Sequence, residues 1–231
     1  AIIHAAGSPN ASHSHFEAQD LMERGLGENA NIYSGWFGRY IDSTLMTDDP
    51  VFRALAMGTT APRSLAHSEP SIAMNSIEGF NLQVDGEQRS EIESNLLVLF
   101  SGSSLLDQQA VNTLNAVQSL EVADPAQYQI ENGAQYPETT FGRELMEVGQ
   151  MIRSGLGVEV AGINLGGWDT HEGENATLNT LLAEFAQGLA AFSTDMGDLM
   201  STITVVTMTE FGRRAYENGS SGTDHGHASF M

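Results

Sequence analysis

The sequence predicts an α/β fold in which a mostly parallel β-sheet is flanked by helices. Residues 157–165 and 202–208 are two short apolar runs, which favour buried strands. Between them, apolar side chains recur at helical spacing over residues 178–199, which indicates a long amphipathic helix. A strand, a long helix and a second strand make a βαβ unit, whose strands are parallel. The 231 residues, 41% of them hydrophobic, suffice for one α/β domain with a real core.

The first part of the chain predicts a strand and two helices. Residues 1–6 are apolar and end at a turn signal, so they are expected to form a strand. Residues 12–23 predict a helix, and Ser14 with Glu17 matches a capping box near its start. The helical spacing of aromatic and aliphatic residues over 36–45 predicts a second helix.

The middle of the chain predicts a strand, an irregular stretch and three helices. Residues 53–57 are short and apolar enough to form a strand, whereas 58–88 is rich in Gly, Pro, Ser and Asn and is expected to be irregular. Helices are expected over 91–100 and 105–122, and Pro137 opens another. The apolar face of that third helix consists of Phe141, Leu145, Val148 and Ile152.

The whole chain, residues 1–231, is expected to form a single domain with a less regular excursion near residues 58–135. It is also expected to be a fragment of a longer protein, incomplete at both ends. Its first residue already lies in the first predicted strand, and its last two residues resemble the start of another strand. No signal peptide is visible in these residues.

The charge of the chain argues against several classes of partner. The formal net charge is −21, and all nine basic residues are arginine. A field of this sign repels nucleic acid and anionic membranes, and it repels anionic substrates unless metal cations reverse it locally. The simplest explanation of the charge is a strongly solvated surface. No apolar run approaches the ~20 residues that span a bilayer, and the lack of cysteine excludes disulfides and thiolate metal sites.

Polar side chains gather directly after both strands of the predicted βαβ unit. Residues 164–171 follow the first strand, residues 209–213 follow the second, and residues 222–227 come shortly afterwards. Both strands end at the same edge of a parallel sheet, where active sites of such folds lie, so these loops are expected to converge. Gly222 and Gly226 are expected to let the backbone turn tightly.

The three clusters carry groups that bind hard or borderline divalent metals. Asp169 and His171 are two residues apart, which puts them on one side of an extended segment, and His225 and His227 share this spacing. Carboxylates and imidazoles without thiolates suit Zn²⁺ or Mn²⁺. Four or more such ligands can hold two ions about 3.5–4 Å apart, as in phosphoryl hydrolysis. The candidate metal ligands are Asp169, His171, Glu210, Asp224, His225 and His227.

Plainer interpretations stay open for the same residues. A solvated Glu210, or a hydrogen-bonded loop pair of Asp224 and His225, would explain these side chains without a metal. Arg213 is a candidate for binding an anionic substrate through two parallel hydrogen bonds, and a surface ion pair explains it nearly as well.

Four strings in the sequence resemble one known family. They are GGWDTH at residues 166–171, TEFGR at 209–213, GTDHG at 222–226 and the opening GSPNASHSHFEAQDLMERG at 7–25. They resemble the family catalogued as domain of unknown function 1501, and the resemblance covers nearly the whole chain. It implies a fold like that of the alkaline phosphatase and sulfatase superfamily. It also implies twin-arginine export, and therefore a periplasmic or extracellular location.

The resemblance also implies roles for the metal-binding candidates. In that superfamily an Asp and a His after one strand bind metal, a place that Asp169 and His171 would take. An Asp-His-Gly string follows the next strand, but here residues 210–212 are Glu-Phe-Gly, and a phenyl ring cannot bind a metal. The ligand lost at that position would come from Asp224, His225 or His227.

A hydroxyl nucleophile at a helix start is a further implication of the resemblance. Ser14 fits that place, because it follows the first predicted strand and lies where the next helix begins. A helix N-terminus lowers the pKa of an attacking hydroxyl and stabilises anionic oxygens. A plain N-cap explains a serine there as well. His15 matches the family string and is a candidate for contacting the substrate or a metal. Asn164 is a candidate for binding the substrate.

The leading functional hypothesis is an exported, metal-dependent hydrolase of phosphate or sulfate esters. It would act on a small anionic ester with Zn²⁺, or alternatively Mn²⁺, and with Ser14 and Arg213 as catalytic groups. The alternative is an exported metal-binding or assembly protein without catalytic turnover, which the departure at Phe211 favours. A third hypothesis is that the polar clusters are purely structural.

Overall fold

A small open sheet of three parallel strands forms the centre of this α/β chain. The computed structural model describes residues 2–8, 10–26, 31–44, 50–66, 71–84 and 86–231. Within them the strands are β1 (Ala54–Met57), β2 (Ser71–Met74) and β3 (Val160–Gly162), in the order β2-β1-β3. The prediction of an α/β fold with a parallel sheet is therefore confirmed.

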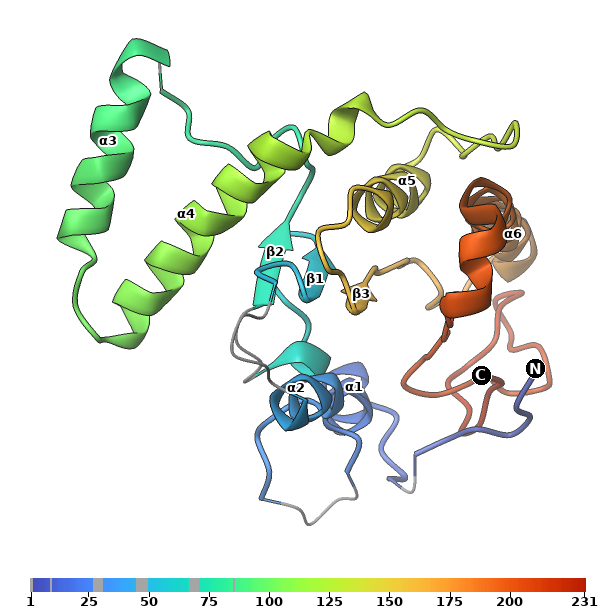
Figure 1. The fold of residues 1–231 in the computed structure, drawn as a ribbon. Coiled ribbons are helices and arrows are strands. Elements are labelled where there is room, and N and C mark those ends of the chain that lie inside the picture. The colour runs from blue at the N-terminus through green and yellow to red at the C-terminus, as the bar shows by residue number, and fades with distance from the viewer. Residues whose placement is uncertain (1, 9, 27–30, 45–49, 67–70, 85) are drawn as a thin grey trace.

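Helices lie on both sides of this sheet (Figure 1). In the described part of the chain they are α1 (His15–Arg24), α2 (Trp36–Ser43), α3 (Gly86–Leu99), α4 (Leu105–Ala123), α5 (Thr140–Arg153) and α6 (Glu174–Met196). Short 3-10 turns η1 (Arg63–Leu65), η2 (Pro125–Gln127) and η3 (Gly197–Thr202) connect some of them.

The central strand β1 sends its side chains alternately into two cores. Leu55 and Met57 enter the larger core, which residues of α4, α5 and α6 complete. Ala54 and Ala56 enter a smaller core with residues of α2 and η1. Because successive side chains of a strand point to opposite faces, burial on both faces is what a continuous apolar run such as residues 54–57 predicts.

Helices α5 and α6 pack closely against each other over the larger core. On α5, Phe141, Leu145 and Val148 are buried, as the helical spacing predicted. On α6, Gly188 faces them, and an added Cβ there would lie 2.8 Å from Phe141 and 2.9 Å from Leu145. The absence of a side chain at Gly188 is therefore what lets the two helices approach.

The N-terminal residues do not form the predicted strand. Residue 1 lies outside the described residues, and residues 2–6 pair instead with the other end of the chain, so the prediction is wrong. Ala6 N donates to Ser229 O at 2.9 Å and Ile3 N donates to Met231 O at 2.8 Å, an antiparallel pairing apart from the central sheet. Ile3 remains 55% exposed, because no layer covers this short pairing. Figure 1 shows the two ends close together.

The prediction of a strand over 202–208 is also wrong. Residues up to 202 belong to η3, and residues 203–208 have no strand partner in the described part of the chain. Val205 and Val206 are exposed. An apolar run forms a strand only where a neighbouring ladder satisfies its backbone, and β3 pairs only with β1 among the described strands. The second strand of the predicted βαβ unit is therefore not formed in the described residues. The first strand, β3, is shorter than the predicted run 157–165.

The stretch expected to be irregular contains a strand of the central sheet. Residues 71–74 form β2, which pairs with β1 along its whole length, Ala54 with Ser71 and Met57 with Met74. Farther along, α3 and α4 form a hairpin in which α3 is the helix farther from the sheet (Figure 1). None of the described side chains of α3 is buried, whereas Ala116 and Leu120 of α4 lie in the larger core.

The capping box predicted at Ser14 is not formed, although the helix is. Ser14 has the extended backbone of an N-cap, but its side chain makes no capping hydrogen bond to α1. The complete capping box lies at α4, where the side chain of Ser104 accepts from Asp107 N and the carboxylate of Asp107 accepts from Ser104 N. No helix among the described residues is long and apolar enough to span a membrane.

Candidate metal centre

Backbone hydrogen bonds join loops from distant parts of the chain beside the start of α1. Gly226 N donates to Gly212 O at 2.7 Å, and Arg214 N donates to Asp224 O at 2.9 Å. Thr223 N donates to the carbonyl of Thr170 at 3.2 Å. These bonds join the segments 164–171, 209–213 and 222–227, the three segments in which the sequence places its polar clusters.

Two glycines allow this close packing of loops. A Cβ on Gly222 would overlap the backbone of His171, and a Cβ on Gly226 would overlap the backbone of Arg213. Neither glycine has a positive φ. The observed role of both glycines is therefore close approach between loops, without use of the left-handed conformation.

Three imidazole rings direct their Nε2 atoms at the carboxylate of Asp169. His225 Nε2 lies 2.8 Å and His171 Nε2 lies 2.9 Å from Oδ1 of Asp169. The two imidazole nitrogens lie 2.9 Å from each other. His15 Nε2 lies 3.2 Å from the other carboxylate oxygen. Ligand atoms of His15, Asp169 and His225 all fall within 4.8 Å of one another, and His171 adds a fourth group.

The opposite nitrogen of each ring is bonded to an acceptor. His15 Nδ1 lies 2.6 Å from Glu210 Oε1, and His171 Nδ1 lies 3.1 Å from Asp224 Oδ1. His225 Nδ1 lies 2.8 Å from the backbone carbonyl oxygen of residue 13. An acceptor at Nδ1 holds the proton there in the neutral ring and leaves the lone pair on Nε2. Each ring is thus oriented as metal-binding histidines are, with the second nitrogen donating to an oxygen.

The ionisation of the cluster follows from these contacts. Hydrogen bonding to Glu210 raises the pKa of His15 above its ordinary value of 6.5, against the opposing effect of burial. Burial favours a higher pKa for Asp169, but its contacts with Arg213 and His225 outweigh burial and hold the pKa well below its usual range. In the same way, the bond from His15 lowers the pKa of Glu210 against the effect of burial. Asp169 and Glu210 are therefore carboxylates at neutral pH.

The donor set fits a divalent metal. Three imidazole nitrogens and a carboxylate oxygen are the kinds of ligand that Zn²⁺ takes in tetrahedral sites. His15 Nε2 is shielded from solvent, yet no group in the described residues meets hydrogen-bond geometry with it. This nitrogen lies 3.2 Å from Asp169 Oδ2, and a cation held between the two atoms would satisfy both. His15, Asp169, His171 and His225 would hold the ion.

The other predicted ligands lie around this group. Glu210 and Asp224 bind the far nitrogens of His15 and His171, so they orient ligands. His227 is exposed, and no described residue offers its side chain a hydrogen-bond partner. Asn164 is exposed in the loop after β3, outside the network of contacts around Asp169. Ser14 directly precedes His15, and its hydroxyl is not used in capping α1.

Arg213 contacts the cluster through Asp169. Its Nη1 donates to Asp169 Oδ1 at 2.6 Å. Its Nε donates to Thr223 Oγ1 at 3.1 Å and its Nη2 donates to the carbonyl of Thr223. The guanidinium is therefore anchored at three places, and it shares an acceptor oxygen with two of the imidazoles.

Sequence reasoning missed several groups that shape the site. Phe211 is buried, and its ring lies 4.8 Å from the ring of His15 and 4.6 Å from that of His225. Asn218 donates to His171 O at 3.0 Å and to Asp224 Oδ1 at 3.1 Å. The GTDHG string gave no signal for Asn218, which precedes it. The opening string at residues 7–25 did contain His15, which was expected to contact the substrate or a metal.

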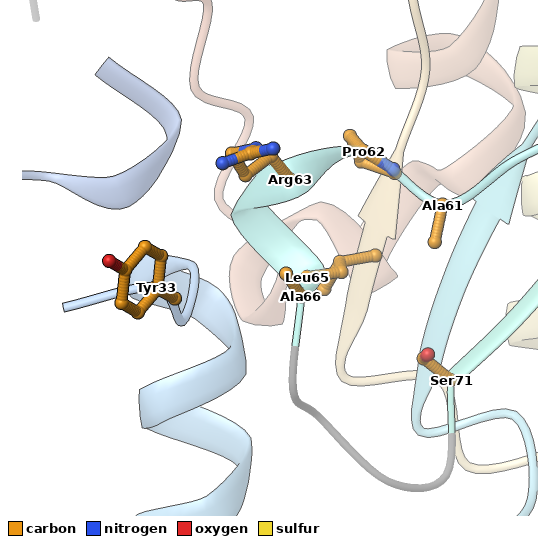
Figure 2. Close-up of a pocket in the computed structure, with 7 residues that line it drawn as sticks. All are labelled: Tyr33, Ala61, Pro62, Arg63, Leu65, Ala66 and Ser71. Carbon is orange, nitrogen blue, oxygen red and sulfur yellow. The ribbon is translucent and has the colours of Figure 1, made fainter. Parts of the chain in front are cut away.

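A pocket in the described part of the chain lies away from this cluster. It encloses about 570 Å³, and Figure 2 shows its lining, which includes Tyr33, Arg63 and Ser71. None of its lining residues belongs to the cluster around Asp169. The cluster is instead an open site, with the side chain of Asp169 45% exposed. A small anion from solvent can therefore reach it.

The fold and this cluster define an α/β protein with a histidine- and carboxylate-lined site suited to a cation. The model of one family matches residues 3–231, and its description is "Protein of unknown function (DUF1501)". The chain belongs to that family, as the four strings indicated. No curated protein and no solved structure matches the chain.

Proposed function

We propose that this chain carries the metal site of an exported hydrolase of phosphate or sulfate esters with an alkaline phosphatase-like fold. One observation carries the proposal: three imidazoles direct Nε2 at Asp169, while each Nδ1 is bonded to an oxygen acceptor. Such prior orientation is typical of metal ligands and unnecessary for a solvated loop. The proposed location is the periplasm or the cell exterior, in keeping with the family strings.

The site suits one ion, most simply Zn²⁺, rather than the pair that the sequence suggested. Glu210 and Asp224 are the carboxylates that a second ion would need, and both are engaged by imidazoles. Phe211 replaces another donor. A bound ion supplies Lewis-acid polarisation of an ester oxygen. The Nε2 atoms of His15, His171 and His225 would hold it.

Two residues of the chain are suited to the remaining chemistry. Arg213 brings a fixed guanidinium beside Asp169, where it can neutralise an anionic ester. Ser14 lies at the N-terminus of the ten-residue helix α1 and next to His15 in the chain, with a hydroxyl not used for capping. The partial positive charge at a helix N-terminus favours the alkoxide of an attacking serine. Asn164 remains a candidate for binding the substrate.

Metal content and turnover test the proposal together. Purified protein reconstituted with Zn²⁺ is expected to hold one ion per chain and to hydrolyse an aryl phosphate or an aryl sulfate. Asp169→Asn should weaken metal binding by more than about a hundredfold, since it removes a ligand rather than a ligand's partner. His4→Ala removes an imidazole outside the cluster and serves as the control.

The outcomes separate the proposed function from its alternative. Two of the six candidate ligands, Glu210 and Asp224, are hydrogen-bonded to imidazole rings, and Phe211 provides no ligand. This shortage of ligands favours a metal-binding protein without turnover as the second candidate. One bound ion with no hydrolysis of either ester would support that second candidate. A folded protein that takes up no metal would refute both.

A further inference from the structure

Arg213 competes for the same carboxylate oxygen that the imidazoles approach. Its Nη1 lies 2.6 Å from Asp169 Oδ1, closer than His225 Nε2 at 2.8 Å or His171 Nε2 at 2.9 Å. A carboxylate oxygen in contact with a guanidinium has less negative potential to offer a second cation. The contact between Arg213 and Asp169 is therefore expected to weaken metal binding at this carboxylate.

The guanidinium is held so that it cannot easily move aside. Nε donates to Thr223 Oγ1 and Nη2 donates to Thr223 O, which belongs to a backbone segment bonded to Thr170. The side chain of Arg213 is 21% exposed. A cation bound at Asp169 would consequently have a fixed positive charge as its neighbour, which disfavours both cations together unless an anion joins them.

The donors that remain on Arg213 suit such an anion. A guanidinium has five N–H groups, one on Nε and two on each terminal nitrogen. Three of them are used, by Thr223 Oγ1, Thr223 O and Asp169 Oδ1. One N–H on each terminal nitrogen therefore remains without an acceptor in the described residues, and such donors favour the oxygens of phosphate and sulfate.

We propose that Arg213 is a resident counter-cation of Asp169, which opposes metal binding at that carboxylate and serves as the binding group for a tetrahedral oxyanion beside it. The inference rests on the proposed metal site. Arg213 then has opposite effects on the binding of the two ligands, because its positive charge repels the metal and attracts the anion. A residue that merely positions Asp169 would instead help metal binding, so the two roles differ in sign.

Isothermal titration with Zn²⁺ in anion-poor buffer, followed by titration of the loaded protein with inorganic phosphate or sulfate, tests the proposal. Arg213→Gln is expected to tighten Zn²⁺ binding by about tenfold and to weaken oxyanion binding by about tenfold. One charge-assisted hydrogen bond changes a binding constant by about this factor. Arg213→Lys keeps the charge but loses the planar fork. It should bind Zn²⁺ like the wild type and bind the oxyanion more weakly.

Arg214→Gln is the matched control. It removes the same charge from the neighbouring position, where Arg214 Nη1 donates to the hydroxyl of Tyr216 and not to Asp169. Zn²⁺ binding by Arg213→Gln that is weaker than wild type, or no tighter than in Arg214→Gln, overturns the inference while leaving the metal site in place. Failure of the wild-type protein to bind Zn²⁺ overturns the proposed function as well. Arg213→Lys keeps the test decisive if the Gln variant does not fold.

Discussion

Asp224 shows how a single side chain can act on the site through another. Its carboxylate lies 3.1 Å from His171 Nδ1 and also accepts from Asn218 Nδ2 at 3.1 Å. These hydrogen bonds, from Asn218 first and His171 second, lower the pKa of Asp224. A charged acceptor at Nδ1 makes the opposite nitrogen a stronger donor of electrons to a metal.

Replacing Asp224 by Asn should therefore weaken the metal site without removing a ligand. Asn keeps an oxygen that can accept from His171 but loses the negative charge, so we expect the Kd for Zn²⁺ to rise about tenfold. Competition with a chromophoric chelator measures that constant. Asp198→Asn removes an equal charge from η3, away from the loops of the cluster. Equal Zn²⁺ affinities of the two variants would contradict the role given to Asp224.

Phe211 illustrates a second effect at the residue scale. The resemblance to the alkaline phosphatase and sulfatase superfamily implies a metal ligand at this position, and a phenyl ring cannot be one. In the structure this ring packs against the imidazoles of His15 and His225. Phe211 thus places an apolar surface against two of the imidazoles, of the kind that controls solvent access around metal sites.

At the scale of single elements, helix α5 carries two buried carboxyl groups on its otherwise apolar face. Glu144 is 8% and Glu147 is 7% exposed. Burial raises the pKa of both, and for Glu147 the hydrogen bond from Ile77 N opposes the rise. A carboxyl group whose pKa is raised by folding binds its proton more tightly in the folded state. Its contribution to stability therefore falls as pH rises past the unfolded value of 4.5.

Glu147→Gln should consequently stabilise the protein at neutral pH. Gln retains an oxygen that can accept from Ile77 N, and it has no charge to desolvate, so we expect a rise in Tm of about 2 °C at pH 7. The advantage should shrink as the pH falls toward 4.5, where the wild-type carboxyl becomes protonated. Thermal unfolding followed by circular dichroism across this range measures it. The exposed Glu138→Gln is the charge-matched control, and a lower Tm for Glu147→Gln at pH 7 would contradict the prediction.

The end of α6 shows how an element can be anchored by polar groups. Asp195 is fully buried and accepts from the hydroxyls of Tyr128 and Tyr136 and from the backbone N of Glu131. Burial, followed by the bonds to Asp195, raises the pKa of both tyrosines, which therefore stay protonated donors. The loop before α5 is held against the helix that leads toward the site.

For the molecule as a whole, the net charge of −21 is the dominant electrostatic fact. The chain has thirty acidic and nine basic residues. Most of the repulsion between the acidic residues is between exposed side chains. Self-repulsion of this kind destabilises the compact state, and salt screens it with a Debye length of about 10 Å at 0.1 M. Surface ion pairs weaken under the same conditions but contribute little to stability.

Raising the ionic strength should therefore stabilise the protein. We expect Tm to rise by about 5 °C between low salt and 0.3 M salt, because screening relieves more repulsion than it removes attraction. Scanning calorimetry in NaCl measures the change, and NaClO₄ at equal ionic strength separates screening from specific salt effects. A Tm that falls with both salts would mean that ion pairs, such as Arg89 with Glu93, outweigh the repulsion.

The sequence by itself determined the features that depend on local pattern and on composition. Helical spacing located α1 to α6 to within a few residues, apolar runs located β1 and the centre of β3, and the polar strings marked the residues of the cluster. Residue types alone also limited the chemistry to carboxylate and imidazole ligands. These features follow from the 3.6-residue and 2-residue periods and from side-chain chemistry, which act over short separations.

Only the tertiary structure decided which atom faces which. His15 and Glu210 are 195 residues apart, and His225 bonds the carbonyl 212 residues before it. Contacts at such separations leave no periodic trace, so the sequence did not show that Glu210 and Asp224 bond to imidazoles or that His15 Nε2 faces Asp169. The same limit explains the errors at residues 2–6 and 203–208. An apolar run becomes a strand only when another segment meets its backbone, and that meeting is a property of the whole fold.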